Sequence, residues 1–352
     1  MLMTPGPTAL PPSVREAAGE ELLNPDVDPA FADRYDALKR KLGRVYGTDD
    51  EVVVLGGEGI LGLEAAVAST VAPGDRVLCL SNGPYGDGFA DFVERYGGEA
   101  TLVDADYDDS LPIDALERTL DAETFDLATM VHCETPTGTL NDLGPALDLF
   151  AAHDVRTVVD AVSSLGGTPV PTDRIDVAIG ASQKCFSAPP GLAVCTVSDA
   201  AWERIEARDP DPLYTNLLPW HEAEQPYPYT HLSTLVVALE AALDLLLDEG
   251  LDAVYDRHRE AARICRERGR ELGLEPFPDP ERSSPTVTAF SVPGRATALQ
   301  ERLRTAHDVT LSTGFGDLAD DVLRVGHMGY NADVERVERT MDTLATALDR
   351  VD

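Results

Sequence analysis

Apolar runs and helical patterns alternate along the first two thirds of the chain. Short runs rich in β-branched residues recur between residues 52 and 197, and segments with apolar residues at helical spacing separate them. Several of these runs are apolar at every position, which is typical of parallel strands with both faces covered. The pattern therefore predicts an α/β domain with a mostly parallel sheet. Its strands are expected at 52–55, 76–80, 100–103, 127–132, 156–159, 177–179 and 192–197.

The pattern changes beyond the last of these strands. Residues 199–230 are rich in Pro, Tyr and Trp and are expected to form loops, whereas 233–248 and the segment up to 272 have helical spacing. Past a Pro-rich break, strands are expected at 287–292, 309–312 and 322–327, with helices at 295–306 and from 331 onward. The resulting division is an N-terminal arm over 1–16, a large domain over 17–245 and a smaller α/β domain over 246–352.

The composition excludes several classes of partner. The chain has 63 acidic and 28 basic residues and a net charge of −35, so nucleic acid and anionic membrane would both be repelled. Lysine occurs only at positions 39, 41 and 184. Charge and lysine scarcity together favour a halophilic protein, whose surface is screened by concentrated salt, over an acidic mesophile protein. The five scattered cysteines match neither a disulfide framework nor a metal site. The N-terminus lacks the features of a signal peptide, so a cytoplasmic location is expected.

A glycine-rich turn follows the first predicted strand. The residues Gly56-Gly57-Glu58-Gly59-Ile60 open a helical run, and such a turn presents free N–H groups to a phosphate. The glycines also match Gly-x-Gly-x-x-Gly, but the next strand ends in Leu80-Ser81-Asn82-Gly83 without the acid that binds ribose hydroxyls. A dinucleotide site is therefore not favoured, and a turn without a ligand stays an alternative.

Two residues that end later strands suggest a specific chemistry. Asp160 closes an apolar strand, where a carboxylate needs a partner; a protonated pyridine nitrogen would supply one, and a capping hydrogen bond is the alternative. Lys184 stands just past the next strand, in Gly180-Ala-Ser-Gln-Lys. Desolvation there would lower the pKa of its amine, so that it could attack an aldehyde. A role as an ordinary surface lysine suits Lys39 and Lys41 much better.

Two further side chains are candidates for binding. Arg324 lies inside an apolar strand, and a buried guanidinium needs an anion, either a substrate carboxylate or an internal aspartate. Tyr85 lies on the tight loop after the second strand, in Asn82-Gly-Pro-Tyr-Gly. It would either stack on a flat cofactor ring or simply pack against its neighbours.

Together, these motifs resemble the class V aminotransferases, which are pyridoxal 5′-phosphate (PLP) enzymes of fold type I. The likeness covers nearly the whole chain, through Thr4-Pro-Gly-Pro-Thr, Val159-Asp-Ala-Val-Ser-Ser-Leu-Gly-Gly, Gly180-Ala-Ser-Gln-Lys and Leu323-Arg-Val-Gly-His-Met-Gly. The nearest branch is that of the alanine–glyoxylate and serine–pyruvate aminotransferases. This implies amino transfer from a small amino acid, of the alanine or serine type, to a small 2-oxo acid such as glyoxylate or pyruvate. It also implies a homodimer whose sites are shared across the interface.

The resemblance assigns roles around the ring and the substrate. Lys184 would form the Schiff base and move a proton between the substrate Cα and C4′, and Asp160 would pair with the pyridinium nitrogen. Val162 and Tyr85 would cover the two ring faces, and Thr135 would hydrogen-bond near the ring hydroxyl. Arg324, as the residue pattern also allows, would bind the substrate carboxylate.

The resemblance likewise assigns the phosphate contacts. Gln183 and the amides of Gly59 and Ile60 would hold the phosphate. Tyr227 and Thr230, in Tyr227-Pro-Tyr-Thr, would reach the phosphate of the neighbouring subunit.

One departure from the branch lies in the phosphate turn. The branch usually has Ser-Gly followed by Thr or His, whereas this chain has Glu58-Gly59-Ile60. A carboxylate touching a phosphate is repelled by roughly 4 kcal/mol at an effective dielectric constant near 20, so we expect Glu58 to point away. Two alternatives stay open. A lyase such as a cysteine desulfurase needs a nucleophilic cysteine on a mobile loop, and none follows Cys265. A catalytically silent scaffold is favoured by Glu58 alone.

Overall fold

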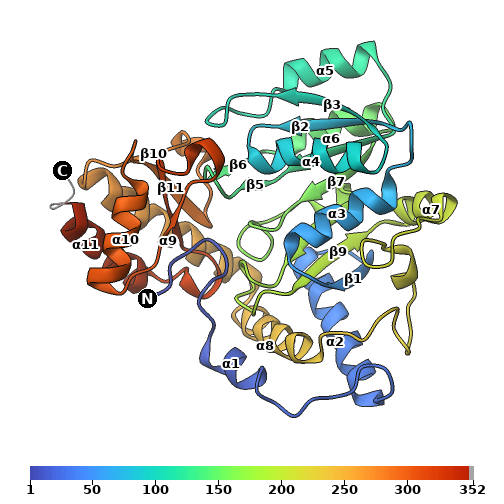
Figure 1. The fold of residues 1–352 in the computed structure, drawn as a ribbon, viewed down its shortest axis with the longest axis horizontal. Helices are drawn as coiled ribbons and strands as arrows, with labels where there is room; N and C mark the ends of the chain where they lie inside the picture. The colour runs from blue at the N-terminus through green and yellow to red at the C-terminus, as the bar shows by residue number, and fades with distance from the viewer. Residues whose placement is uncertain (349–352) are drawn as a thin grey trace.

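The computed structural model describes residues 1–348, and its centre is a seven-stranded sheet (Figure 1). The strand order is β1-β9-β8-β7-β4-β2-β3, and β9 alone runs against the others. The mostly parallel α/β architecture is therefore confirmed. The strands are β1 (Glu51–Gly56), β2 (Arg76–Ser81), β3 (Glu99–Asp104), β4 (Leu127–Val131), β7 (Arg156–Asp160), β8 (Val177–Ala181) and β9 (Leu192–Val197).

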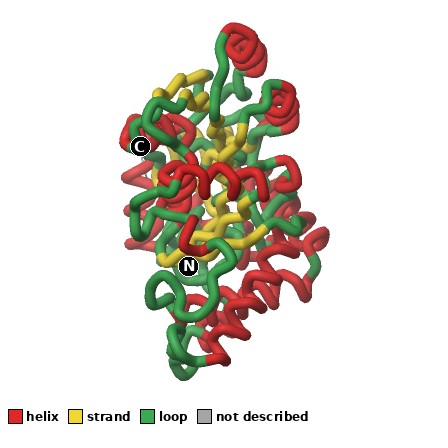
Figure 2. Tube along the Cα trace, turned by 90° about the vertical axis from the view of Figure 1, so that its right-hand side faces the viewer, coloured by secondary structure: helices red, strands yellow, loops and turns green. Residues whose placement is uncertain are grey.

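Helices lie on both sides of this sheet (Figure 2), which explains why the strands are apolar throughout. They are α2 (Pro29–Tyr46), α3 (Gly59–Thr70), α4 (Pro84–Arg95), α5 (Ile113–Ala122), α6 (Gly144–Ala152), α7 (Asp199–Arg208) and α8 (Ser233–Glu249). A small hairpin, β5 (Cys133–Glu134) with β6 (Thr139–Leu140), follows β4.

The glycine pattern at the start of α3 serves close packing. A Cβ at Gly62 would lie 2.8 Å from Ile179 Cγ2 on β8, and one at Gly59 would lie 3.1 Å from Val162 Cγ2. These glycines let the helix approach the sheet, so the match to Gly-x-Gly-x-x-Gly needs no dinucleotide.

The prediction of loops over 199–230 is wrong at its start, where α7 forms. The Ser198 side chain accepts a hydrogen bond from the N–H of Ala201 and so caps the helix. Trp202 and Ile205 lie about one turn apart and are both buried. The Trp-rich composition thus reflected a short amphipathic helix rather than a loop.

The C-terminal part has its own antiparallel sheet, of order β10-β11-β13-β12. The strands are β10 (Glu275–Pro276), β11 (Val287–Ser291), β12 (Ser312–Thr313) and β13 (Val322–Gly326); the helices are α9 (Leu251–Glu271), α10 (Ala296–His307) and α11 (Val334–Leu348). A second apolar cluster lies between α9, α10, α11 and this sheet. Among residues 1–348, no helix has the length and apolarity that a membrane span requires.

The N-terminal arm connects the two parts. Leu2 pairs with Thr310 and Met3 is buried in the C-terminal cluster. The chain then crosses to the large domain, where α1 (Pro12–Ala17) packs against α8 (Figure 1). Between these two anchors, residues 4–8 pass over the carboxyl end of β8, next to Lys184.

Candidate active site

A cavity of about 280 Å³ opens at the carboxyl ends of the parallel strands, where ligands of open α/β sheets bind. Loops after β1, β7 and β8, the hairpin residue Thr135, Tyr85 at the start of α4 and the N-terminal arm enclose it. Nearly every residue assigned to the ring from the sequence is brought together here. The lining residues are Gly6, Pro7, Glu58, Gly59, Ile60, Leu63, Tyr85, Thr135, Asp160, Val162, Ser163, Gln183, Lys184 and Pro190.

Lys184 is a half-buried residue that lines this cavity. Its Nζ donates a hydrogen bond to the carbonyl of Pro5 at 2.7 Å. Burial, assisted by the nearby Arg324 guanidinium, lowers its pKa from 10.5 to about 8. At neutral to slightly alkaline pH, the nucleophilic neutral amine is therefore roughly 200-fold more populated than in an exposed lysine.

The arm residue Gly6 makes room for this lysine. Its φ of +110° lies in the region that favours glycine, and a Cβ there would lie 2.6 Å from Lys184 Cδ. The Thr4-Pro-Gly-Pro-Thr motif thus shapes the roof of the cavity.

Asp160 faces the cavity from the end of β7. Its Oδ1 accepts the N–H of Val162 at 2.7 Å, and its second carboxyl oxygen has no hydrogen-bond partner within residues 1–348. Burial raises its pKa from 3.8 to about 6, against the opposing effects of that hydrogen bond and of Lys184. A protonated pyridine nitrogen would supply the missing donor and favour the charged carboxylate. Both readings of Asp160, the capping hydrogen bond and the ring partner, are compatible with this geometry.

The remaining ring residues line the same space. Val162 and Tyr85 are both in the cavity wall, and the Tyr85 ring also stacks on Phe315, at 6.4 Å between centroids. The Thr135 hydroxyl is hydrogen-bonded to that of Ser163. These positions fit the faces and edge of a flat ring held between Lys184 and Asp160.

Glu134 is a site residue that the sequence reasoning missed, although it adjoins Thr135. It is fully buried, and its carboxylate accepts the N–H groups of Gly86 at 2.7 Å and Tyr85 at 3.3 Å. Burial raises its pKa to about 8. A Cβ at Gly83 would overlap this carboxylate. Glu134 therefore fixes the start of α4 and, with it, the position of Tyr85. The available signal was an acid three residues past the end of β4.

Arg324 lies on β13 beside the cavity. Its Nε donates to the carbonyl of Thr313 at 2.6 Å and Nη1 to that of Thr135 at 3.4 Å. Within residues 1–348 it forms no ion pair, so the internal aspartate considered from the sequence is not its partner there. A guanidinium that is largely withdrawn from water and faces carbonyls only is suited to an anionic ligand.

The phosphate end differs from the sequence expectation. The Glu58 side chain does not point away: Oε1 accepts the N–H of Ile60 at 3.1 Å, and Oε2 accepts the Gln183 amide at 3.0 Å. The local reason is that Glu58 is the N-cap of α3, where a carboxylate satisfies free N–H groups. Gln183, Gly59 and Ile60 line the cavity as expected, but two of the expected phosphate donors already have a partner.

Tyr227 and Thr230 do not line the cavity of their own chain. The Tyr227 ring packs between Tyr35 and Trp220. The Thr230 hydroxyl donates to Asp26 at 2.9 Å. Their reach to the site of a neighbouring subunit stays a prediction.

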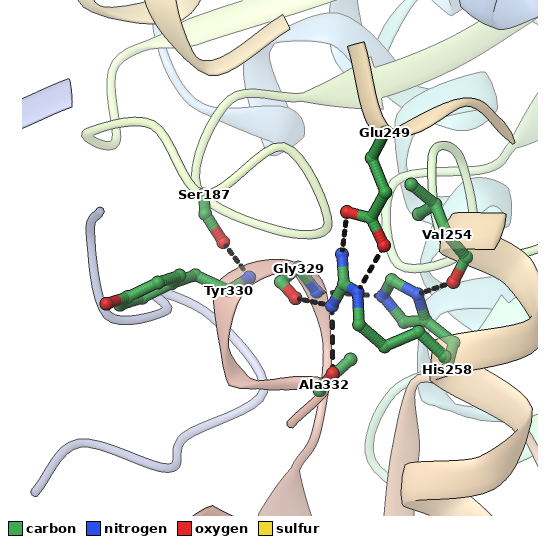
Figure 3. A network of polar contacts seen from close by, with 8 residues as sticks. Ser187, Glu249, Val254, His258, Gly329, Tyr330 and Ala332 are labelled. Atoms are coloured by element: carbon green, nitrogen blue, oxygen red, sulfur yellow. Dashed lines mark hydrogen bonds and ion pairs between the residues drawn. The ribbon is translucent and has the colours of Figure 1, made fainter. Parts of the chain in front are cut away.

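A polar network holds the loop that follows Lys184 (Figure 3). Ser187 Oγ accepts the N–H of Tyr330 at 2.7 Å, and His258 Nε2 accepts that of Gly329 at 2.9 Å. Burial lowers the pKa of His258 to about 3, so the ring stays neutral and keeps this acceptor. Arg257 donates to the carbonyl of Gly329 at 2.7 Å and pairs with Glu249. The lysine loop is thus tied to α9 and to the turn after β13, which carries Arg324.

The sheet order, the lysine after β8 and the aspartate that ends β7 define a fold type I enzyme that uses a pyridoxal ring. The chain belongs to the class V aminotransferases, since the family model described as "Aminotransferase class-V" matches residues 1–333. The family uses pyridoxal 5′-phosphate, which confirms the expected cofactor class. In this chain, the ring end of the site fits that cofactor and the phosphate end holds a carboxylate.

Named relatives extend the comparison. Pyridoxamine–pyruvate transaminase of Mesorhizobium japonicum is 34% identical over 94% of this chain and 86% of its own length. Alanine–glyoxylate aminotransferase of Oryctolagus cuniculus is 32% identical over 99% and 92%. The crystal structure of pyridoxamine–pyruvate aminotransferase from Mesorhizobium loti superposes with a TM-score of 0.95 at 32% identity, over 99% of this chain and 92% of that one. The chain is therefore a class V aminotransferase by family, and these relatives are named for amino transfer to pyruvate or glyoxylate.

Proposed function

We propose that the acceptor is a small 2-oxo acid of the pyruvate or glyoxylate type and that the amino acid is of the alanine or serine type. The observation that carries the proposal is that Lys184 and Asp160 line one cavity of about 280 Å³, with Arg324 beside it and without an ion pair among residues 1–348. The same cavity must hold both the pyridoxal ring and the substrate. A small side chain on the amino acid therefore suits it best.

Three residues of this chain have separate roles in the proposed reaction. When bound, the pyridoxal ring supplies the reactive aldehyde carbon and an electron sink. Asp160 would hold the proton on the ring nitrogen and so strengthen that sink. Lys184, with its lowered pKa, would be the acid–base group that moves the Cα proton of the substrate. Arg324 would bind the substrate carboxylate and so orient the substrate toward the lysine.

The visible absorption spectrum tests this function. Protein saturated with a pyridoxal vitamer in concentrated potassium chloride is expected to show the band of the Lys184 Schiff base, and L-alanine is expected to bleach it. Pyruvate should restore the band. A band that neither L-alanine nor L-serine changes would exclude small donors of this type.

Arg324→Ala is expected to raise KM for alanine and pyruvate on the order of 10- to 100-fold, because a charge-assisted, forked contact to the carboxylate is lost. Ring binding should be unchanged, as judged by the Schiff-base band. Steady-state kinetics measure the effect, with Arg339→Ala, an exposed arginine on α11, as the matched control. An unaltered KM would remove Arg324 from the substrate site.

We also propose a halophilic, cytoplasmic homodimer. Exposed large apolar side chains support an interface; they include Leu22, Val27, Leu213, Tyr214 and Leu232. The charge of −35 supports the need for screening salt. Sedimentation in molar potassium chloride is expected to give twice the chain mass, and dilution into low-salt buffer to give unfolded monomers. A folded monomer in molar salt would contradict the dimer.

A second candidate function is favoured by one observation, the carboxylate of Glu58 in the phosphate turn. The Mesorhizobium relative is named for pyridoxamine, a vitamer without phosphate. For this chain, the amino carrier would then be pyridoxamine itself.

A further inference from the structure

The anion site at the start of α3 already contains an anion of this chain. The backbone N–H of Ile60 and the Gln183 amide are donors that a cofactor phosphate would be expected to use, and both bind Glu58 instead, at 3.1 and 3.0 Å. The carboxylate also lies at the positive end of the helix macrodipole. A phosphate entering this turn would have to displace Glu58 from both donors.

The cavity offers no positive charge near the turn that would offset the free-energy cost of displacing Glu58 from these donors. Its lining contains two carboxylates, Glu58 and Asp160, and Lys184 as the sole basic side chain. Lys184 would be taken up by the Schiff base with the ring aldehyde, on the carbon opposite the ring nitrogen that Asp160 would face. A phosphate would therefore meet Glu58 at contact range without a lining lysine or arginine beside it, and like charges at this distance repel strongly even at the effective dielectric of a protein surface.

A 5′-hydroxymethyl group matches the same residues. A carboxylate only accepts hydrogen bonds, so Gln183 must present its NH₂ to Glu58. This leaves Gln183 Oε1 buried, with no partner within residues 1–348. Of these two acceptors, the Glu58 carboxylate belongs to a residue that lines the cavity. A hydroxyl can donate to it, whereas a phosphate dianion has no proton to donate.

We propose that Glu58 takes the place of the cofactor phosphate and that this chain uses unphosphorylated pyridoxal and pyridoxamine as exchangeable substrates. The inference rests on the proposed aminotransferase function and names the carrier of the amino group. The overall step is pyridoxamine plus a 2-oxo acid giving pyridoxal plus an amino acid. The C4′ amine is oxidised to an aldehyde, the oxo carbon is reduced to an amine, and nitrogen and oxygen change places, so no other reactant is needed.

The vitamer is expected to exchange with solvent because it lacks the phosphate that would otherwise anchor the ring. A phosphate normally holds the ring through both half-reactions, even when the bond to lysine is broken. A hydroxymethyl contact is a far smaller anchor, and the amine form has no covalent link to Lys184. The product vitamer is therefore expected to leave after its half-reaction: pyridoxamine once an amino acid has donated its amino group, and pyridoxal, after hydrolysis of its bond to Lys184, once a 2-oxo acid has accepted one. The vitamer is then a substrate rather than a resident cofactor.

Titration of the Schiff-base band with pyridoxal and with pyridoxal 5′-phosphate tests the proposal without relying on turnover. The unsubstituted protein is expected to bind pyridoxal more tightly, with a Kd ratio on the order of 100. Glu58→Gln, which keeps the shape and removes the charge, should reduce that ratio to below about 10. Glu117→Gln, at an exposed position on α5 outside the cavity lining, should leave the ratio unchanged. Far-UV circular dichroism checks that each variant is folded.

A second measurement follows the released vitamer. With pyridoxamine and pyruvate in large excess over protein, pyridoxal and alanine are expected to accumulate in equal amounts over many turnovers. Tighter binding of pyridoxal 5′-phosphate by the unsubstituted protein, or an unchanged ratio in Glu58→Gln, would overturn the inference and leave the aminotransferase function intact. No Schiff-base band with either vitamer would instead overturn the proposed function itself.

Discussion

Lys184→Ala is expected to abolish the Schiff-base band and to lower the rate of amino transfer on the order of 10,000-fold. The substitution removes both the nucleophile that bonds the aldehyde and the base that moves the proton from Cα to C4′. The absorption spectrum measures the first loss, and single-turnover bleaching with alanine measures the second.

Two further variants are compared with Lys184→Ala, one that keeps the positive charge and one that serves as a control. Lys184→Arg keeps a cation near Asp160 but cannot form the Schiff base, so it should be as inactive as the alanine variant. Lys39→Ala, on α2 and away from the cavity, should behave like the unsubstituted protein. A band that persists in Lys184→Ala would show that a different amine carries the ring.

Asp160→Asn is expected to slow amino transfer on the order of 100- to 1,000-fold while the Schiff base still forms. An amide cannot offset the positive charge of a protonated ring nitrogen, so the electron sink weakens at the moment when the Cα proton leaves. Single-turnover kinetics with alanine measure the loss. Asp114→Asn, an exposed substitution on α5, is the matched control and should leave the rate unaltered.

The pH dependence of ring binding gives Asp160 an independent readout. Burial raises the pKa of its carboxyl to about 6, so the free protein takes up a proton there as the pH falls through 6. Protonation removes the partner of the pyridinium, and affinity for the protonated ring should therefore decrease below pH 6. The asparagine variant should lack this decrease. The same decrease in both proteins would assign it to another group.

Glu58 is the residue by which the phosphate turn of this chain differs from that of the branch. In the branch that the chain resembles, the phosphate turn offers hydroxyl-type donors, and here it offers a carboxylate. The ring-binding residues are unaffected, since Asp160, Val162 and Lys184 come from other loops. A change at one helix cap would thus alter which vitamer enters without altering the chemistry at C4′.

Much of the fold could be predicted from the sequence because local patterns determine it. The strands that carry the site were expected within two residues of their observed ends, since covered parallel strands are apolar throughout and turn residues bound them. Helix α7 was missed because its tryptophan and its proline-rich surroundings obscured a Ser198 cap and a three-residue buried face. The short strand β12 begins near the end of the predicted 309–312 strand, where pairing with β13 rather than composition decides its position.

The sequence by itself determined the chemistry: a lysine after β8 in a nearly lysine-free chain, and an acid that ends an apolar strand. Tertiary structure alone decided which groups meet. Glu58 and Gln183 are 125 residues apart, and only the packing of α3 on β8 brings the carboxylate and the amide together. Glu134 became a buried acid under Tyr85, and Arg324 stayed without an ion-pair partner among the described residues, for the same reason. Hydrogen bonding and burial between distant segments depend on the folded geometry, which no local pattern encodes.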